Sequence, residues 1–165
     1  GIYTKGIIIY DIEKHKRLIR EFRKERIQFK RSFLEHLTAY QIDNNFNLGN
    51  TKIIIDRIKT KKVFIYIIGF DYDTEVDLMF EEYPDYVKIL KPHPNQKESV
   101  NKSQYDFIID NDVLVELFII ESLKVFDEII VVHQDSSALE YFNKIENLTS
   151  INIMDKWRSH KAKSI

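Results

Sequence analysis

The sequence predicts an α/β fold, a Rossmann-like parallel sheet with helices on both faces that is preceded by a helical segment. Two observations support this prediction. From Lys62 onward, short runs rich in β-branched and aromatic residues alternate with stretches whose apolar residues recur at helical spacing. Such alternation is typical of parallel strands joined by right-handed helical crossovers. The 165 residues suffice for one domain with a substantial core.

Composition excludes several classes of protein. A formal net charge of -1 argues against a general nucleic-acid binder. The chain has no cysteine, which excludes disulfides and thiolate metal sites and fits a reducing, cytoplasmic location. No apolar run approaches the roughly 18 residues of a membrane-spanning helix. Because the sequence does not begin with methionine, we expect it to be a piece of a longer protein.

We expect residues 1–60 to form an N-terminal helical or interdomain segment. Residues 5–10 indicate a strand, and apolar residues then recur at mostly helical spacing from Asp11 to about Tyr40, as one long helix or two abutting helices. This stretch is rich in lysine and arginine. It is either a solvated helix face or a surface that contacts an anionic membrane, such as the inner face of the bacterial membrane, or an acidic glycan, and its helix invites homodimerisation. Residues 51–58 fit a strand or a short helix.

Residues 61–165 are expected to form the Rossmann-like domain. Asp73 or Thr74 is expected to cap the first helix, Asp112 the second and Ser136 the third. The expected elements, in order, are a strand over 62–70, a helix over 74–83, a strand over 86–90, a helical turn within 95–104, a strand over 105–109, a helix over 113–124, a strand over 129–133, a helix over 136–146 and a strand over 150–154.

Polar side chains follow three of these strands. They are Asp71 and Asp73 after the first, Lys91 and His93 after the second, and Asp135, Ser136 and Ser137 after the strand over 129–133. Because the carboxyl ends of parallel strands meet at one edge, where ligands bind, these groups should converge. Pro92 and Pro94 hold His93 rigidly, which suits an anionic ligand; the alternative is a turn whose histidine faces water.

Ser136 and Ser137 are expected at the start of a helix, where unpaired N–H groups and the helix dipole favour an anion. Their hydroxyls would complete a phosphate cradle, unless Ser136 only caps the helix.

Two further patterns carry carboxylates. Asp71 could be a general base beside His93 as general acid, although Asp71 and Asp73 also fit a divalent-metal motif or a capping pair. Glu116 lies on a largely apolar helix and faces either a ligand or solvent. No His-x-x-x-His pair is present, so we expect no zinc site.

The set Asp71, Lys91-Pro92-His93-Pro94, Glu116 and Ser136-Ser137 resembles the motifs of bacterial sialyltransferases with the GT-B architecture. The resemblance is closest to the lipooligosaccharide sialyltransferases of glycosyltransferase family 52. Those families share an acidic motif, a His-Pro motif and a Ser-Ser/Thr motif, in this order and at similar spacing. The resemblance covers about residues 62–154.

The resemblance implies that this chain is the C-terminal, nucleotide-binding portion of a GT-B enzyme. Such enzymes transfer sialic acid from CMP-sialic acid to a bacterial lipooligosaccharide or capsular glycan, with inversion and without a metal or other cofactor. Asp71 would deprotonate the acceptor hydroxyl, and His93 would protonate the departing CMP phosphate. The donor would be bound by Lys91 and Pro92 near the cytosine, Glu116 near the ribose, and Ser136 and Ser137 at the phosphate. Asp135 would lie beside the serines.

Two departures from the family pattern leave questions open. The chain has room for only one of the two GT-B domains, so the domain that binds the glycan acceptor, a lipid-linked one, would be missing. The acidic motif is Asp-Tyr-Asp rather than acid-acid-Gly, so either Asp71 or Asp73 could be the base. The alternatives are a glycosyltransferase with another nucleotide-sugar donor and a non-catalytic α/β interaction module.

Overall fold

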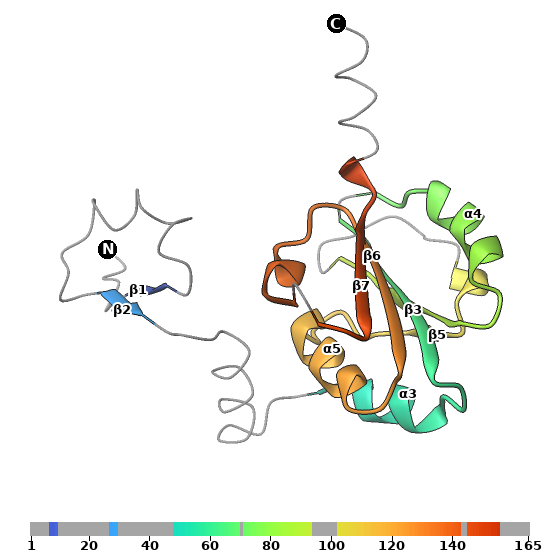
Figure 1. The fold of residues 1–165 in the computed structure, drawn as a ribbon, viewed down its shortest axis with the longest axis horizontal. Coiled ribbons are helices and arrows are strands. Elements are labelled where there is room, and N and C mark those ends of the chain that lie inside the picture. Colours follow the sequence, from blue (N-terminus) through green and yellow to red (C-terminus); the bar gives the residue numbers. More distant parts are fainter. Residues whose placement is uncertain are drawn as a thin grey trace, which may run out of the picture. The chain divides into compact units, whose positions relative to one another are not determined.

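The structure is a computed structural model that describes residues 7–9, 27–29, 48–69, 71–93, 102–142 and 145–155. The chain divides into two compact units, Gly1–Phe46 and Asn47–Ile165. In the first unit, strand β1 (Ile7–Ile9) pairs in parallel with strand β2 (Ile27–Phe29), with Ile7 opposite Ile27 (Figure 1).

Strand β2 shows that the helix predicted over residues 11–40 is wrong at Ile27–Phe29. The apolar residues Ile27 and Phe29 alternate with Gln28, which is the period of a strand, and the apolar run of β1 supplies a pairing partner. The strand predicted over residues 5–10 is confirmed at Ile7–Ile9. The remainder of the predicted helix and residues 156–165 lie outside the described residues.

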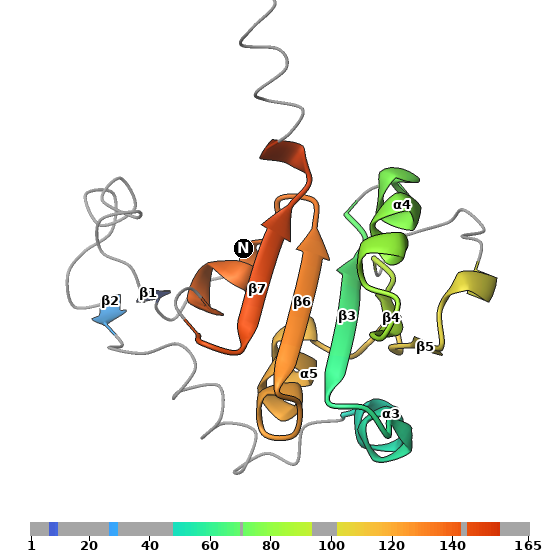
Figure 2. The same ribbon diagram turned by 45° about the vertical axis from the view of Figure 1, so that its right-hand side comes forward.

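The second unit contains a five-stranded, all-parallel sheet in the order β5-β4-β3-β6-β7 (Figure 2). Its strands are β3 (Lys62–Ile67), β4 (Val87–Lys91), β5 (Phe107–Ile108), β6 (Glu128–His133) and β7 (Leu148–Asn152). The chain starts in the middle at β3, moves outward through β4 and β5, and returns to β6 on the other side of β3. This Rossmann order places the topological switch point between β3 and β6, where doubly wound sheets bind ligands.

Helices cover both faces of this sheet, as the sequence predicts. The helical elements are α3 (Thr51–Arg57), α4 (Glu75–Glu82), η2 (Lys102–Gln104), α5 (Val115–Leu123) and η3 (Ser137–Phe142). Figure 1 shows α4 and α5 on opposite sides of the sheet. Phe64 and Tyr66 of β3 pack with Val76 and Met79 of α4 in one core cluster. The intervening residue Ile65 is also fully buried, because a parallel sheet covered on both faces buries successive side chains.

Two helix starts differ from the prediction. Helix α5 begins at Val115 with Leu114 as its N-cap and no side-chain capping bond, so the predicted Asp112 cap is wrong. A turn closed by the Val113 N–H and the Asp110 carbonyl precedes the helix instead. The predicted α-helix over 136–146 is a six-residue 3₁₀ helix, η3, because β7 begins at Leu148 and leaves only a short connection. Among the described helices, none has the length and apolar character needed to cross a membrane.

Candidate functional site

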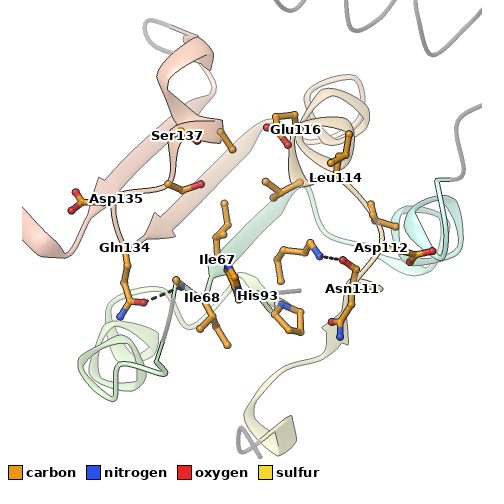
Figure 3. Close-up of a pocket in the computed structure, with 17 residues that line it drawn as sticks. Ile67, Ile68, His93, Asn111, Asp112, Leu114, Glu116, Gln134, Asp135 and Ser137 are labelled. Carbon is orange, nitrogen blue, oxygen red and sulfur yellow. Dashed lines mark hydrogen bonds between the residues drawn. The ribbon is translucent and has the colours of Figure 1, made fainter. Parts of the chain in front are cut away.

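A cavity of about 620 Å³ opens at the carboxyl edge of the sheet (Figure 3). It is lined by four segments that follow neighbouring strands: residues 67–69, 91–93, 111–116 and 134–138. The first and last of these leave β3 and β6, so the cavity lies at the topological switch point. Its size falls within the range of sites for small molecules and cofactors.

Most of the site residues that the sequence singles out line this cavity. They are Lys91, Pro92, His93, Glu116, Asp135, Ser136 and Ser137. Figure 3 shows Ser137 and Glu116 across the cavity from His93. The chain therefore brings the His93 imidazole, the Glu116 carboxylate and the two serine hydroxyls to one cavity, from segments that follow β4, β5 and β6. Asp71 and Asp73 are not among the lining residues.

The Asp71–Asp73 loop has a structural role of its own. An oxygen of the Asp73 carboxylate accepts a 2.9 Å hydrogen bond from the Glu75 N–H, and the Asp73 N–H donates to the Tyr66 hydroxyl at 3.1 Å. Thr74, one of the two predicted caps, is the N-cap residue of α4 but makes no side-chain capping bond, and the Asp73 carboxylate closes a turn onto the first residue of the helix. Asp71 is exposed on the same loop, at the carboxyl edge of β3.

Tyr72 anchors that loop to the core. Its hydroxyl donates to the Asp77 carboxylate and lies 2.9 Å from the Tyr105 hydroxyl. Burial, followed by the bond to Asp77, raises the pKa of Tyr72, so the phenol stays protonated. Tyr72 is partly buried against the core, so the residue that follows Asp71 is tied to α4 and to Tyr105.

Lys91 is 4% exposed and uses its amino group to hold a neighbouring loop. Its Nζ donates to the carbonyls of Asp110 and Asn111, each at 3.0 Å. Burial lowers the pKa of Lys91, while the carboxylates of Asp112, Asp110 and Glu116 oppose that shift. Lys91 therefore lines the cavity mainly as a support for its β5–α5 wall.

The β5–α5 wall is also fixed from outside the cavity. Asn50 donates from Nδ2 to the Ile108 carbonyl at 2.8 Å, and its backbone N–H donates to the Asp110 carboxylate at 3.0 Å. The Asp110 N–H returns a bond to the Asn50 side-chain oxygen at 3.1 Å. Gly49 precedes this contact with φ of 50°, and a Cβ there would meet Val113 Cγ2 at 2.5 Å. Glycine is required at that position for both reasons.

The loop that carries the serines is held by His133. Nδ1 of His133 accepts a hydrogen bond from the Ser136 N–H at 3.0 Å, and Nε2 lies 3.0 Å from the Ser150 hydroxyl. Because Nδ1 accepts, the proton of the neutral ring is assigned to Nε2, which donates to Ser150. Burial lowers the pKa of His133, and Asp135 and Asp155 oppose this. The ring is therefore neutral at physiological pH.

Two more side chains fix the same loop. The Gln134 side-chain oxygen accepts a 2.9 Å bond from the Gly69 N–H and so bridges the ends of β3 and β6. Asp135 has a left-handed backbone, with φ of 50°. Its carboxylate accepts from Asn152 Nδ2 at 2.7 Å, and its N–H donates to the Asn152 side-chain oxygen at 3.2 Å. The reciprocal pair stabilises a conformation that non-glycine residues seldom adopt.

These contacts determine what the cavity can do chemically. The anion cradle predicted at a helix start is wrong in its details, since η3 is a short 3₁₀ helix and the Ser136 N–H is occupied by His133. An anion would instead meet hydroxyl groups and the half-buried imidazole of His93. Among the described residues, no group of three or more histidine or acidic side chains could hold a metal ion.

Sequence reasoning missed Gln134, Asn111 and Gly69 as parts of this site. A usable signal exists for Gln134, which stands between the end of β6 and the Asp135-Ser136-Ser137 run. Gly69 follows β3 directly, and a Cβ at Gly69 would lie 2.7 Å from the Gln134 side-chain oxygen. Asn111 contributes a backbone carbonyl to Lys91, for which its identity gives no signal.

No family model, curated protein or solved structure matches this chain.

Proposed function

We propose that this chain is the donor-binding portion of an inverting sialyltransferase. It would bind CMP-sialic acid and transfer the sialic acid to a lipid-linked lipooligosaccharide or capsular glycan of a bacterium. The observation that supports this proposal is the cavity at the β3/β6 switch point, into which separate strand ends bring His93, Glu116, Ser136 and Ser137. The motif resemblance at the same positions supports the choice of donor.

The charges around the cavity favour a donor with one phosphate over a nucleoside diphosphate sugar. Asp112, Glu116 and Asp135 line it, and Lys91 is the one lysine or arginine among the described residues that do. The amino group of Lys91 already donates to two carbonyls. A second phosphate would add negative charge where the wall offers little to balance it. Hydroxyl donors and one imidazole suit the single phosphate of a CMP-sugar.

Each residue then takes one role in the transfer. The acceptor hydroxyl gives its proton to Asp71 as its oxygen attacks the anomeric carbon of sialic acid. The bond between that carbon and the phosphate oxygen breaks, and His93 gives a proton to the departing CMP phosphate. Ser136 and Ser137 donate hydrogen bonds to the phosphate as charge develops on it.

Asp71 is the better candidate for the base because the Asp73 carboxylate already accepts a hydrogen bond from the Glu75 N–H. It is exposed at the carboxyl edge, where an acceptor bound by another part of the enzyme can reach it. Glu116 accepts hydrogen bonds from the ribose hydroxyls. Pro92 and the aliphatic part of Lys91 form an apolar surface against the cytosine.

The proposed reaction needs neither a metal nor a cofactor. It takes place in the cytoplasm, at the inner face of the membrane on which lipid-linked acceptors are made. Contact with that membrane and formation of a homodimer would involve the basic stretch within residues 11–40, which lies outside the described residues except at Ile27–Phe29.

Calorimetric titration of the full chain with CMP, UDP and GDP tests the proposal. We expect CMP to bind more tightly than either diphosphate. His93→Ala and the double variant Ser136→Ala/Ser137→Ala should each weaken CMP binding by about tenfold, because each removes donors to the phosphate. Ser103→Ala, an exposed serine away from the cavity, is the matched control and should bind CMP like the parent.

Two outcomes would overturn the proposal. Equal affinity for CMP and UDP would favour a glycosyltransferase with a different donor. If the parent chain does not bind CMP and His93→Ala leaves the free energy of unfolding unchanged, a non-catalytic α/β module is favoured.

A further inference from the structure

We propose that His133 is a positioning residue that holds Ser136 and Ser137 in the geometry needed to bind the donor phosphate. This inference rests on the proposed function, since it concerns the same cavity. His133 is the last residue of β6 and is 7% exposed. It is not among the residues that line the cavity, so it acts from behind the loop rather than on the ligand.

The hydrogen bond from the Ser136 N–H to His133 Nδ1 decides where the loop goes after β6. The chain turns at Asp135, whose left-handed backbone, with φ of 50°, is unfavourable for a residue with a Cβ. Asn152 holds Asp135 on one side of the turn. His133 holds Ser136 on the other side, and the two serines leave the turn toward the cavity. Without the imidazole acceptor, the Ser136 N–H would lose its partner and the turn could relax.

The ring is itself fixed by its second nitrogen. Nε2 lies 3.0 Å from the Ser150 hydroxyl on the neighbouring strand β7. Gln134, the next residue, fixes the backbone to the end of β3 through the Gly69 N–H. The serine loop is therefore held to three strand ends at once, with the imidazole as the contact closest to the serines.

This arrangement requires a neutral imidazole. A proton on Nδ1 would point a second donor at the Ser136 N–H and replace an attractive contact by a repulsive one. The groups that face the ring are the Ser136 N–H, the Ser150 hydroxyl and the carboxylates of Asp135 and Asp155. The two carboxylates favour protonation, whereas burial disfavours it more strongly. Acidification should therefore release the loop and weaken binding of the donor phosphate.

Three variants of the full chain separate a positioning role from a general packing role. His133→Asn places an amide oxygen near the position of Nδ1, so the acceptor for the Ser136 N–H is kept. His133→Leu fills a similar volume without an acceptor, and Ser150→Ala removes only the contact of Nε2. We expect Asn to hold CMP affinity within about threefold of the parent and Leu to lose about tenfold. Ser150→Ala should fall between them.

A measurement without any ligand tests the same contact. The N–H to N hydrogen bond should give a scalar coupling between the Ser136 amide nitrogen and His133 Nδ1 in the NMR spectrum of the ¹⁵N-labelled chain. On acidification the coupling should vanish as the ¹⁵N chemical shift of His133 Nδ1 changes to the value of a protonated nitrogen. Because this measurement uses the parent chain, it can be made even if His133→Leu fails to fold.

The outcomes keep the two proposals apart. If the parent protein does not bind CMP but shows the coupling, the proposed function fails and the hydrogen bond stands as a structural contact only. If CMP binds and the coupling is absent, or if His133→Leu binds CMP as tightly as the parent, the positioning role is overturned. Rescue by His133→Asn of what His133→Leu loses would support it.

Discussion

Two walls of the cavity are each held by a buried side chain, which donates hydrogen bonds to the backbone in one wall and accepts one from it in the other. On the side of β4 and β5, the buried ammonium of Lys91 donates to the carbonyls of Asp110 and Asn111. On the side of β6, the buried imidazole of His133 accepts from the Ser136 N–H. Burial lowers the pKa of both groups. One wall is therefore held by a cation that donates hydrogen bonds to backbone carbonyls, and the other by a neutral ring that accepts a hydrogen bond from a backbone N–H.

The difference concerns Lys91 and His133, whose polar atoms hold the walls of the cavity. A titratable side chain engaged with the backbone is a poor partner for a bound anion, even where it borders the cavity. The ligand would instead meet the half-buried His93, the serine hydroxyls and the carboxylate of Glu116. Variants of the two walls should consequently differ in size of effect, in pH dependence and in the balance between stability and binding.

The largest effect is expected from Lys91→Met, which keeps the apolar stem and removes the donors. The carbonyls of Asp110 and Asn111 lose their partners, and relief of the buried charge offsets part of that cost. We expect a loss of about 2 kcal/mol in the free energy of unfolding, measured with urea at pH 7. CMP affinity should fall as well, because Glu116 lies just after the segment that Lys91 holds in place. Lys102→Met, at an exposed lysine of η2, is the control, and equal stability of the two variants would contradict the role of Lys91.

A smaller loss is expected from Gly69→Ala, at the bridge between the two strand ends of the switch point. The new Cβ would lie 2.7 Å from the Gln134 side-chain oxygen and 3.0 Å from Gln134 Cβ. Because Gln134 must move, its bond to the Gly69 N–H breaks, and we expect a cost of about 1–2 kcal/mol.

A double-mutant cycle with Gln134→Ala checks the source of that cost. In the Gln134→Ala background the side-chain oxygen is absent, so Gly69→Ala should cost less than half as much as in the parent. Additive free energies of unfolding would show that the Gln134 bridge is not what excludes a Cβ at position 69.

The fold was accessible from sequence because it depends on patterns within single segments. The run from Val63 to Tyr66 is apolar throughout, which predicts a strand covered on both faces, and all of it is buried. Short segments with competing patterns were not accessible. Ile27–Phe29 fits a helical period as well as a strand, and only the pairing with Ile7–Ile9 decides between them.

The candidate site was accessible in outline for a similar reason. Polar residues after parallel strands meet at one edge, which is why His93, Glu116 and Ser137 line one cavity. Their individual partners were not accessible, since these come from distant parts of the chain. Lys91 reaches carbonyls that lie beyond β5, and Asn152 of β7 meets Asp135. Sequence spacing carries no information about such contacts.

The pH dependence of stability should separate the two walls further. The pKa of His133 is lower in the folded protein than its value of about 6.5 in an unfolded chain. The unfolded state therefore binds the proton first as the pH falls. The stability from the neutral ring is complete above about pH 6.5 and declines below it, until the folded ring also becomes protonated. Urea midpoints between pH 7.5 and 5 should fall more steeply for the parent than for His133→Asn, and parallel profiles would contradict this assignment.

The smallest effect, and the one that isolates charge from geometry, is expected from Asp135→Asn. Asparagine tolerates the left-handed backbone, and its side-chain oxygen can still accept from Asn152 Nδ2, so the free energy of unfolding should change by less than about 0.5 kcal/mol. The substitution removes a carboxylate from the cavity lining, and CMP affinity should therefore rise about two- to threefold at low salt, with a smaller gain at high salt. Asp135→Ala removes the same charge but also the bond to Asn152, so it should lose stability and bind CMP no better than the parent. If both variants gained CMP affinity equally, the charge of residue 135 alone would determine its effect on binding. The turn at Asp135 would then be irrelevant to CMP affinity.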